Sequence, residues 1–315
     1  MIDFFDKLYT SLDNKYPLLV RLRVYSLMRV VLRMIANVLL PVYFRFTQNR
    51  KEYILPHCKK ENGRFIVSLT SFPVRAGRLW LVIETMLRQT VKPDMIVLWL
   101  SEKQFLKWED IPQSLRNQQQ RGLTIRLVPE DYRSHKKYHY CLKEFPYDHV
   151  ITIDDDVFYD THLVERMMEA HMVHPDAVIT NKARQIRYND KGELLPYAQW
   201  EADTRKTDNL FVIGIGGNLY PAHCMDEMVI DIDLAMQLTP TGDDIWLNAM
   251  LRMKHTPVIH ASYYFLEQIP VFSLHNVELK SINIKSNNDI QLRQLIAYLM
   301  ERRNVNPFMS QNLKY

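Results

Sequence analysis

Three consecutive carboxylates, Asp154, Asp155 and Asp156, directly follow the apolar residues Val150–Ile153. Carboxylates held side by side raise each other's pKa unless a cation compensates their charge. Mg²⁺ and Mn²⁺ prefer oxygen ligands, and a bound diphosphate can complete their coordination shell. The run is therefore a candidate metal site. The alternative is a solvated acidic turn, or a cap of the helix expected to begin near Thr161.

A second acidic pair, Asp243 and Asp244, follows Gly242 and precedes a helical pattern over Ile245–Met253. A positioned carboxylate can remove the proton from a hydroxyl nucleophile, which contributes roughly 10²–10⁴-fold to the rate. The pair is therefore a candidate for general-base catalysis. The alternative role is structural, with Asp243 or Thr241 capping the helix; a helix N-terminus would also favour an ionised carboxylate.

Glycine is scarce, with 8 in 315 residues, yet three of the eight are Gly214, Gly216 and Gly217. We expect glycine here because the backbone adopts a positive φ or because a ligand approaches it closely. The alternative is a simple turn at the end of a strand. Leu219 occupies the last position of a would-be G-x-G-x-x-G, so the dinucleotide-binding fingerprint fails. The sequence also has no G-x-x-x-x-G-K-[ST] loop, which argues against the P-loop class.

The elements that would position these residues alternate between strand and helix. Apolar strands separated by helices are typical of an α/β fold, with a mostly parallel sheet covered on both faces. Ligands bind such sheets at the carboxyl ends of the strands, so the acidic run would lie at the ligand-binding edge. The expected strands are Arg64–Thr70, Met95–Leu100, Leu123–Val128 and Val150–Ile153, and the expected helices include Leu79–Arg88 and Lys136–Phe145.

The first 50 residues carry a net charge of +5, whereas the remaining 265 sum to −1. Apolar side chains recur here at helical spacing, and Arg29, Arg33 and Asn37 share the opposite side of the helix. Pro41 is expected to end this helix. The pattern predicts a basic amphipathic helix on an anionic membrane surface, through residues 18–45. The alternatives are packing against protein and a membrane span, which the arginines disfavour.

Composition is ordinary for a globular protein, with 47% hydrophobic and 24% charged residues, and it excludes disorder. A net charge of +4 gives no ground for nucleic-acid binding. Cys58, Cys141 and Cys224 are widely spaced, which argues against a disulfide framework or paired-cysteine zinc site and fits a reducing cytosol. We therefore expect a cytoplasmic protein.

The first two expected strands carry a specific pattern, in Phe65–Pro73 (FIVSLTSFP) and Met86–Leu100 (MLRQTVKPDMIVLWL). It resembles the opening of the nucleotide-sugar-dependent glycosyltransferases of the GT-A fold, in particular the family 2-like bacterial enzymes of surface polysaccharide synthesis. The run Asp154–Asp156 falls where this family places its DXD motif, and the resemblance covers about residues 63–250. It implies a GT-A-like layered α/β/α fold with a mostly parallel central sheet.

The resemblance also implies roles for individual residues. The loop after the first strand and a basic segment would bind the donor nucleotide, the acidic run would bind the metal ion, and a carboxylate at a helix start would act as the base. The residues that would contact the donor are Thr70, Ser71, Phe72, Arg75, Lys136, Lys137, Asp154 and Asp155. Asp154 and Asp156 would bind the metal ion, and Gly216 and Gly217 would form the wall beside the sugar. Asp244 would act as the base, with Asp243 beside it.

Three of these assignments have alternatives or open points. His275 is a further candidate metal ligand, on its residue type alone. The basic segment that contains Lys136 and Lys137 could instead be a solvated turn. The chain departs from the family's usual Pro-x-Tyr-Asn at Leu69–Phe72, so the residue that stacks on the base is not assigned.

The implied function is metal-dependent transfer of a sugar from a nucleotide diphosphate sugar, such as a UDP-sugar, to a hydroxyl of a saccharide or lipid-linked saccharide. Inversion, a Mn²⁺ or Mg²⁺ cofactor, and a role in capsule or lipopolysaccharide synthesis belong to the same expectation. So does a peripheral location on the cytoplasmic face of the inner membrane. A sugar nucleotidylyltransferase is the alternative enzyme, but no G-x-G-x-R loop follows the first strand. A non-catalytic nucleotide-sugar-binding protein is the other alternative.

We divide the chain into an N-terminal helical, membrane-associating segment over residues 1–62, a glycosyltransferase domain over 63–280 and a C-terminal helical tail over 281–315. Within the domain, residues 63–160 would form the nucleotide-binding half and 161–280 the acceptor half.

Overall fold

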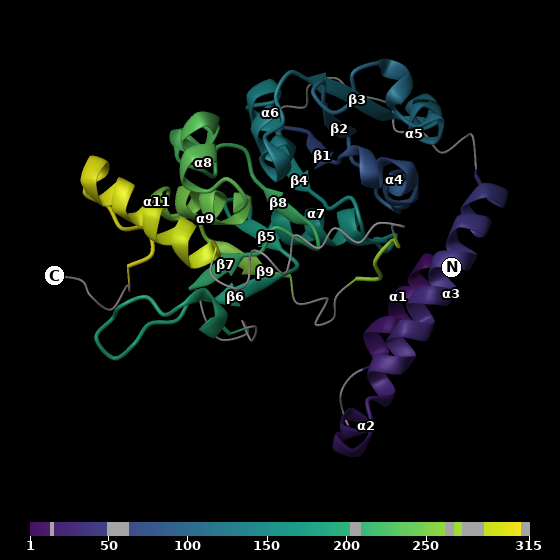
Figure 1. The fold of residues 1–315 in the computed structure, drawn as a ribbon, viewed down its shortest axis with the longest axis horizontal. Coiled ribbons are helices and arrows are strands. Elements are labelled where there is room, and N and C mark those ends of the chain that lie inside the picture. Colours follow the sequence, from purple (N-terminus) through teal and green to yellow (C-terminus); the bar gives the residue numbers. More distant parts are fainter. Residues whose placement is uncertain (13–15, 49–62, 202–208, 262–267, 273–286, 310–315) are drawn as a thin grey trace.

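The computed structural model describes residues 1–12, 16–48, 63–201, 209–261, 268–272 and 287–309. Their centre is a seven-stranded sheet with the order β3-β2-β1-β4-β8-β5-β9 (Figure 1), in which β8 runs antiparallel to both neighbours and the other pairings are parallel. A second sheet pairs β6 with β7. The strands are β1 (Phe65–Thr70), β2 (Met95–Ser101), β3 (Leu123–Val128), β4 (His149–Thr152), β5 (Val178–Thr180), β6 (Ala183–Gln185), β7 (Leu210–Val212), β8 (Asn218–Tyr220) and β9 (Val258–His260).

Helices cover both faces of the sheet because its central strands are apolar on both sides. In β1, Ile66 packs in one cluster with Cys141, whereas Val67 and Leu69 belong to the cluster on the opposite face. The layered α/β fold expected from the sequence is confirmed, and the four expected strands lie within one residue of their observed ends. The helices outside the N-terminal segment are α4 (Pro73–Leu87), α5 (Gln113–Gln118), α6 (Lys136–Glu144), α7 (Leu163–Val173), α8 (Ile232–Leu238), α9 (Asp243–Met253) and α11 (Asn288–Arg303).

Helix α4 begins six residues earlier than the helix expected from Leu79, because Pro73 occupies its first turn. Proline suits this position, since its fixed φ is helical and the N–H that it lacks would have no helical partner. The loop after β1 is therefore short, and it delivers Ser71 and Phe72 directly to the start of a helix.

The N-terminal segment forms a helical hairpin of α1 (Ile2–Ser11), α2 (Pro17–Arg21) and α3 (Val24–Phe46) that extends from the rest of the molecule (Figure 1). The expectation that Pro41 ends the helix is wrong, because α3 continues to Phe46. Proline removes one helical hydrogen bond, but Leu40 and Phe44 on either side of it are fully buried in the same core as Val67. Packing therefore holds the last turns of α3 in place.

Candidate functional site

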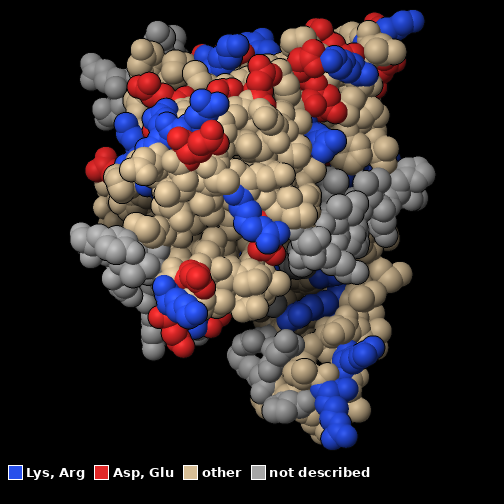
Figure 2. All heavy atoms as spheres, turned by 60° about the vertical axis from the view of Figure 1, so that its left-hand side comes forward, with Lys and Arg blue, Asp and Glu red and all other residues tan. Residues whose placement is uncertain are grey.

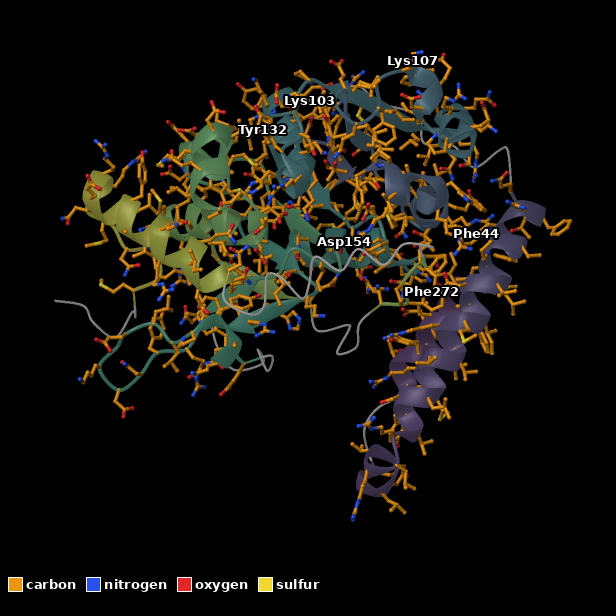
Figure 3. All side chains as sticks on the ribbon, viewed as in Figure 1. Phe44, Lys103, Lys107, Tyr132, Asp154 and Phe272 are labelled. Atoms are coloured by element: carbon orange, nitrogen blue, oxygen red, sulfur yellow. The ribbon has the colours of Figure 1, made fainter. Side chains whose placement is uncertain are left out.

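Strands β1 and β4 are parallel neighbours at the point where the strand order reverses, which is where open α/β sheets bind ligands. Ser71 follows β1 and the three carboxylates follow β4. The Ser71 hydroxyl donates to Asp155 Oδ2 at 2.6 Å, so the two segments meet as expected from the sequence. We call this region the acidic edge; Asp154 marks it in Figure 3. It comprises Ser71, Arg75, Lys137, Asp154–Asp156, Gly214–Gly217, Asp243 and Asp244.

Arg75, in the first turn of α4, is the cation nearest to the acidic run. Its Nη1 lies 2.6 Å from Asp155 Oδ1 and 2.9 Å from Asp156 Oδ2. Its guanidinium also lies 5.3 Å from the centre of the Phe72 ring. Phe72 is only partly buried, so part of this cation–π pair is accessible at the end of β1.

Asp154 is held by hydrogen bonds to both its side chain and its backbone. Its Oδ2 accepts a hydrogen bond from the backbone N–H of Gly216 at 3.1 Å, and its own backbone N–H donates to the hydroxyl of Tyr159 at 2.7 Å. Burial raises the pKa of Asp154 to about 7, although Lys137 opposes this shift. Burial also raises the pKa of Asp156 against the effect of Arg75. Negative charge at this edge is thus incompletely compensated.

The glycine turn between β7 and β8 contacts Asp154 through its backbone. Gly216 has a φ of +85° and Gly217 a φ of +93°, so the expected positive φ is confirmed at both positions. A Cβ on Gly217 would lie 3.1 Å from the Met167 side chain, which leaves little room for a larger residue. The Gly216 carbonyl accepts bonds from Asn181 Nδ2 at 3.0 Å and from Gln268 Nε2 at 3.2 Å. The turn is therefore fixed from both sides.

Lys137, at the start of α6, connects the acidic run to the second acidic pair. Its buried Nζ lies 3.1 Å from Asp243 Oδ2 and donates to the Gly214 carbonyl at 3.1 Å. Burial lowers the pKa of Lys137, but the carboxylates of Asp243 and Asp154 outweigh it and leave the pKa raised. Lys137 is therefore a permanent cation among these carboxylates.

Helix α9 begins at Asp243, and its N-cap is Gly242, which makes no side-chain capping bond. The alternative in which Asp243 or Thr241 caps this helix is therefore wrong. Burial raises the pKa of Asp243, but Lys137, His135 and side-chain hydrogen bonds together outweigh burial and hold the pKa below its ordinary value. Burial, followed by the charge of Asp243, raises the pKa of Asp244 to about 7. The pair thus holds one firmly ionised carboxylate and one that titrates near neutral pH.

Two of the predicted site residues direct their side chains to other partners, and a third cannot be placed. Lys136 is buried and pairs with Asp131 rather than with the acidic edge. The Thr70 hydroxyl donates to the Trp99 carbonyl at 2.8 Å. His275 lies outside the described residues. Sequence reasoning also missed Tyr159, Asn181 and Gln268, which fix Asp154 and the glycine turn, because no motif or spacing marks them.

Within the described ranges, no group of three or more His, Cys, Asp or Glu side chains is arranged to hold a metal ion. Asp154 and Asp156 offer two carboxylates of the oxygen-donor type that Mg²⁺ and Mn²⁺ prefer. Both have raised pKa values, which a cation would reverse. The residues present therefore suit a hard divalent cation such as Mg²⁺ or Mn²⁺.

No protein-family model and no curated protein matches this sequence. Among solved structures, the chain is similar to the mannosyltransferase PcManGT from Pyrobaculum calidifontis in complex with GDP-Man and Mn²⁺, at 10% identity over 89% of this chain and 77% of that one, with a TM-score of 0.45. CMP:2-keto-3-deoxy-manno-octonic acid synthetase complexed with CTP matches at 11% identity over 64% and 89%, with a TM-score of 0.38. HddC from Yersinia pseudotuberculosis matches at 12% identity over 53% and 78%, with a TM-score of 0.33. All three TM-scores lie below 0.5, so these likenesses assign no activity to this chain.

Proposed function

We propose that this chain is a metal-dependent glycosyltransferase that moves a sugar from a nucleotide diphosphate sugar, such as a UDP-sugar, to a hydroxyl of a saccharide or lipid-linked saccharide. The observation that supports it best is the convergence of five separate segments at the acidic edge. A donor-type loop, two groups of carboxylates, a buried lysine and a glycine turn come together there. Synthesis of a bacterial surface polysaccharide is the proposed role.

The donor side of this site lies at the end of β1. The exposed part of Phe72 and its stacked Arg75 would face the nucleotide, and Asp154 and Asp156 would hold Mn²⁺ or Mg²⁺. When bound, the cation supplies positive charge that stabilises the diphosphate leaving group. Arg75, now paired with Asp155 and Asp156, would add to this charge.

The acceptor side lies at the start of α9. A carboxylate with a pKa of about 7 is well matched to accept a proton near neutral pH, which favours Asp244 as the general base. The acceptor oxygen would attack the anomeric carbon as the bond to the diphosphate oxygen breaks, and its proton would pass to Asp244. Such a single displacement inverts the anomeric carbon.

The glycine turn lies between these two sides. Gly216 contacts Asp154, and a Cβ on Gly214 would lie 3.5 Å from Lys137 Nζ and 3.8 Å from Asp243 Oδ2. Backbone without side chains would leave room there for the transferred sugar. The nucleotidylyltransferase alternative is less favoured, because the segment between β1 and α4 contains no glycine.

The test is equilibrium binding of UDP, GDP and CDP with and without Mn²⁺, followed by hydrolysis assays with the matching nucleotide sugars. Asp156→Ala should abolish the Mn²⁺-dependent part of the affinity, because the charge of the diphosphate would then be uncompensated. Asp190→Ala, which removes an exposed carboxylate from a turn, is the matched control. Unchanged metal-dependent affinity in Asp156→Ala would refute the metal assignment.

A further inference from the structure

Helix α3 is apolar on the side that faces solvent. From Leu27 to Val42, every exposed side chain is apolar, and Leu27, Val31, Met34, Val38 and Val42 recur at helical spacing along this side. Leu27 and Val38 are each 65% exposed. Monomeric soluble proteins rarely leave so continuous an apolar surface in water, and such surfaces mark sites of protein or membrane contact.

The polar residues of the same stretch face the protein. Arg29 Nη2 donates to the Leu12 carbonyl at 2.5 Å, and Arg33 Nε donates to the Tyr9 hydroxyl at 2.7 Å. Asn37 Nδ2 donates to the Pro270 carbonyl at 2.8 Å. The interpretation of Arg29 and Arg33 as a basic outer face therefore fails, because both guanidinium groups are bonded to α1 or its end.

The ends of the apolar side carry exposed basic residues. Arg21 and Arg23 lie at the free end of the hairpin, and Arg45 lies at the other end of α3. In Figure 2 the hairpin at the lower right shows blue basic groups toward its free end. The apolar stretch between these arginines suits the acyl region of a bilayer, and the arginines suit the phosphates above it.

We propose that the hairpin inserts the apolar side of α3 into one leaflet of a lipid bilayer and lies in its interface. The helix is 23 residues long and contains an 18-residue stretch with a mean hydropathy of 1.6, which by length and composition also permits a span. A span is disfavoured because the opposite side of α3 is occupied by α1 and by the core around Leu40 and Phe44. Insertion of this kind is hydrophobic, unlike adsorption through a basic face, and does not depend on the proposed activity.

The test is flotation of the full-length protein with vesicles of neutral phosphatidylcholine and with vesicles that also contain anionic phosphatidylglycerol, each at low and high salt. We expect binding to neutral vesicles that persists at high salt. Binding that requires anionic lipid and disappears at high salt would overturn the proposal in favour of electrostatic adsorption. Absence of vesicle binding, with self-association in sedimentation, would assign the surface to a second copy of the chain.

Two double variants locate the contact. Leu27→Glu with Val38→Glu should weaken partitioning into neutral vesicles by about tenfold or more, because two exposed apolar anchors become charged. Arg21→Gln with Arg23→Gln should leave binding to neutral vesicles unchanged. It should remove only the increase in binding that anionic lipid gives, which is about fivefold for each arginine. The reverse ranking would refute insertion through α3. The wild-type measurements decide the question independently of how either variant folds.

Discussion

Two regions of this molecule bury carboxylates, and they balance the charge differently. In α4, the fully buried Glu84 lies 2.8 Å from Arg88 Nε and 2.5 Å from Arg121 Nη1, so one carboxylate faces two guanidinium groups. At the acidic edge, five carboxylates share Arg75 and Lys137 as their cationic partners among the described ion pairs. A buried carboxylate with a purely structural role needs cationic partners that fully compensate its charge. The surplus of negative charge at the acidic edge is what a cationic ligand would neutralise.

The pKa shifts follow this difference in balance. Asp154 and Asp244 both have pKa values raised to about 7, because burial outweighs the nearby lysine. Strongly shifted carboxylates beside a turn of positive-φ glycines are typical of functional sites rather than of structural ion pairs. The comparison therefore predicts that substitutions at the acidic edge change chemistry and pH response, whereas balanced pairs elsewhere change stability alone.

The largest effect is expected for Asp244→Asn. If Asp244 accepts the acceptor proton as the new bond forms, kcat should fall by two to four decades, about 3–5 kcal/mol, while donor affinity stays near that of the wild type. Steady-state kinetics and donor binding measure the two quantities separately. Asp233→Asn, on the exposed side of α8, is the control and should keep full activity.

Asp243→Asn completes this test. If it lowers kcat more than Asp244→Asn does, the base is Asp243 and the mechanism stands. Near wild-type turnover in both variants would place the base outside the pair.

Lys137→Met should cost about 3 kcal/mol of unfolding free energy at pH 8, because a buried carboxylate loses its partner. Without Lys137, the folded-state pKa of Asp243 loses the cation that lowers it and rises, and the pKa of Asp244 rises further above its unfolded value. Groups with raised folded pKa values stabilise the protein at low pH and lose that contribution as pH rises. The destabilisation should therefore be smaller at pH 5.

Denaturant unfolding at both pH values measures this effect. Lys103→Met removes a lysine whose ion pair with Glu130 is exposed, and it should change stability by less than about 0.5 kcal/mol at either pH. If Lys137→Met lowers the free energy of unfolding equally at pH 5 and pH 8, the acidic edge does not hold an excess of negative charge.

Much of this site could be predicted because its signals are local in the sequence. Apolar runs fixed the strands, and Asp154 falls at the carboxyl edge because it directly follows one of them. The scarcity of glycine pointed to the positive φ at Gly216 and Gly217. The partners of these residues could not be predicted in the same way. Nothing in the spacing links Lys137 to Asp243, or chooses it over its neighbour Lys136, because both contacts depend on how distant elements pack.

The N-terminal helix shows the same limit. Helical periodicity placed Arg33 and Asn37 opposite the apolar side, and the structure agrees. Periodicity does not say which side meets the protein, because that depends on the partners available in three dimensions. Tyr9 and the backbone around Pro270 supply those partners, so the polar side faces inward. For the same reason Pro41 could not be recognised as an interior residue of a helix in which Leu40 and Phe44, on either side of it, are buried.

Asn37→Ala tests whether the hairpin is coupled to the acidic edge. We expect the variant to lower the free energy of unfolding by about 2 kcal/mol. Asn37 donates to the Pro270 carbonyl and accepts from the Phe272 N–H at 2.7 Å, so alanine leaves backbone groups unpaired. Figure 3 labels Phe272 beside α3, and the neighbouring Val271 N–H donates to the Asp156 carbonyl at 2.7 Å. The variant should therefore speed hydrogen exchange at Val271.

Ser26→Ala, at an exposed position of the same helix, should change neither stability nor exchange. If Asn37→Ala destabilises the protein but Val271 keeps its protection, the hairpin and the acidic edge are not coupled through this segment.

The smallest effect concerns the pH dependence of Mn²⁺ binding. A cation binds the ionised form of Asp154, whose pKa is about 7, so each pH unit below 7 should weaken binding about tenfold, or about 1.4 kcal/mol. Without metal, the raised pKa of Asp154 makes stability depend on pH in the opposite direction. The folded protein is stabilised when Asp154 is protonated, and it loses this stabilisation as pH rises through 7. The rise in Tm on adding Mn²⁺ alone, relative to a chelator, should therefore be larger at pH 8 than at pH 6.

Asp154→Asn cannot titrate and should remove most of this difference, whereas Asp190→Asn should retain it. An Mn²⁺ effect of equal size at both pH values would mean that the surplus charge at the acidic edge does not bind a cation, and the contrast with the balanced Glu84 pair would lose its functional meaning.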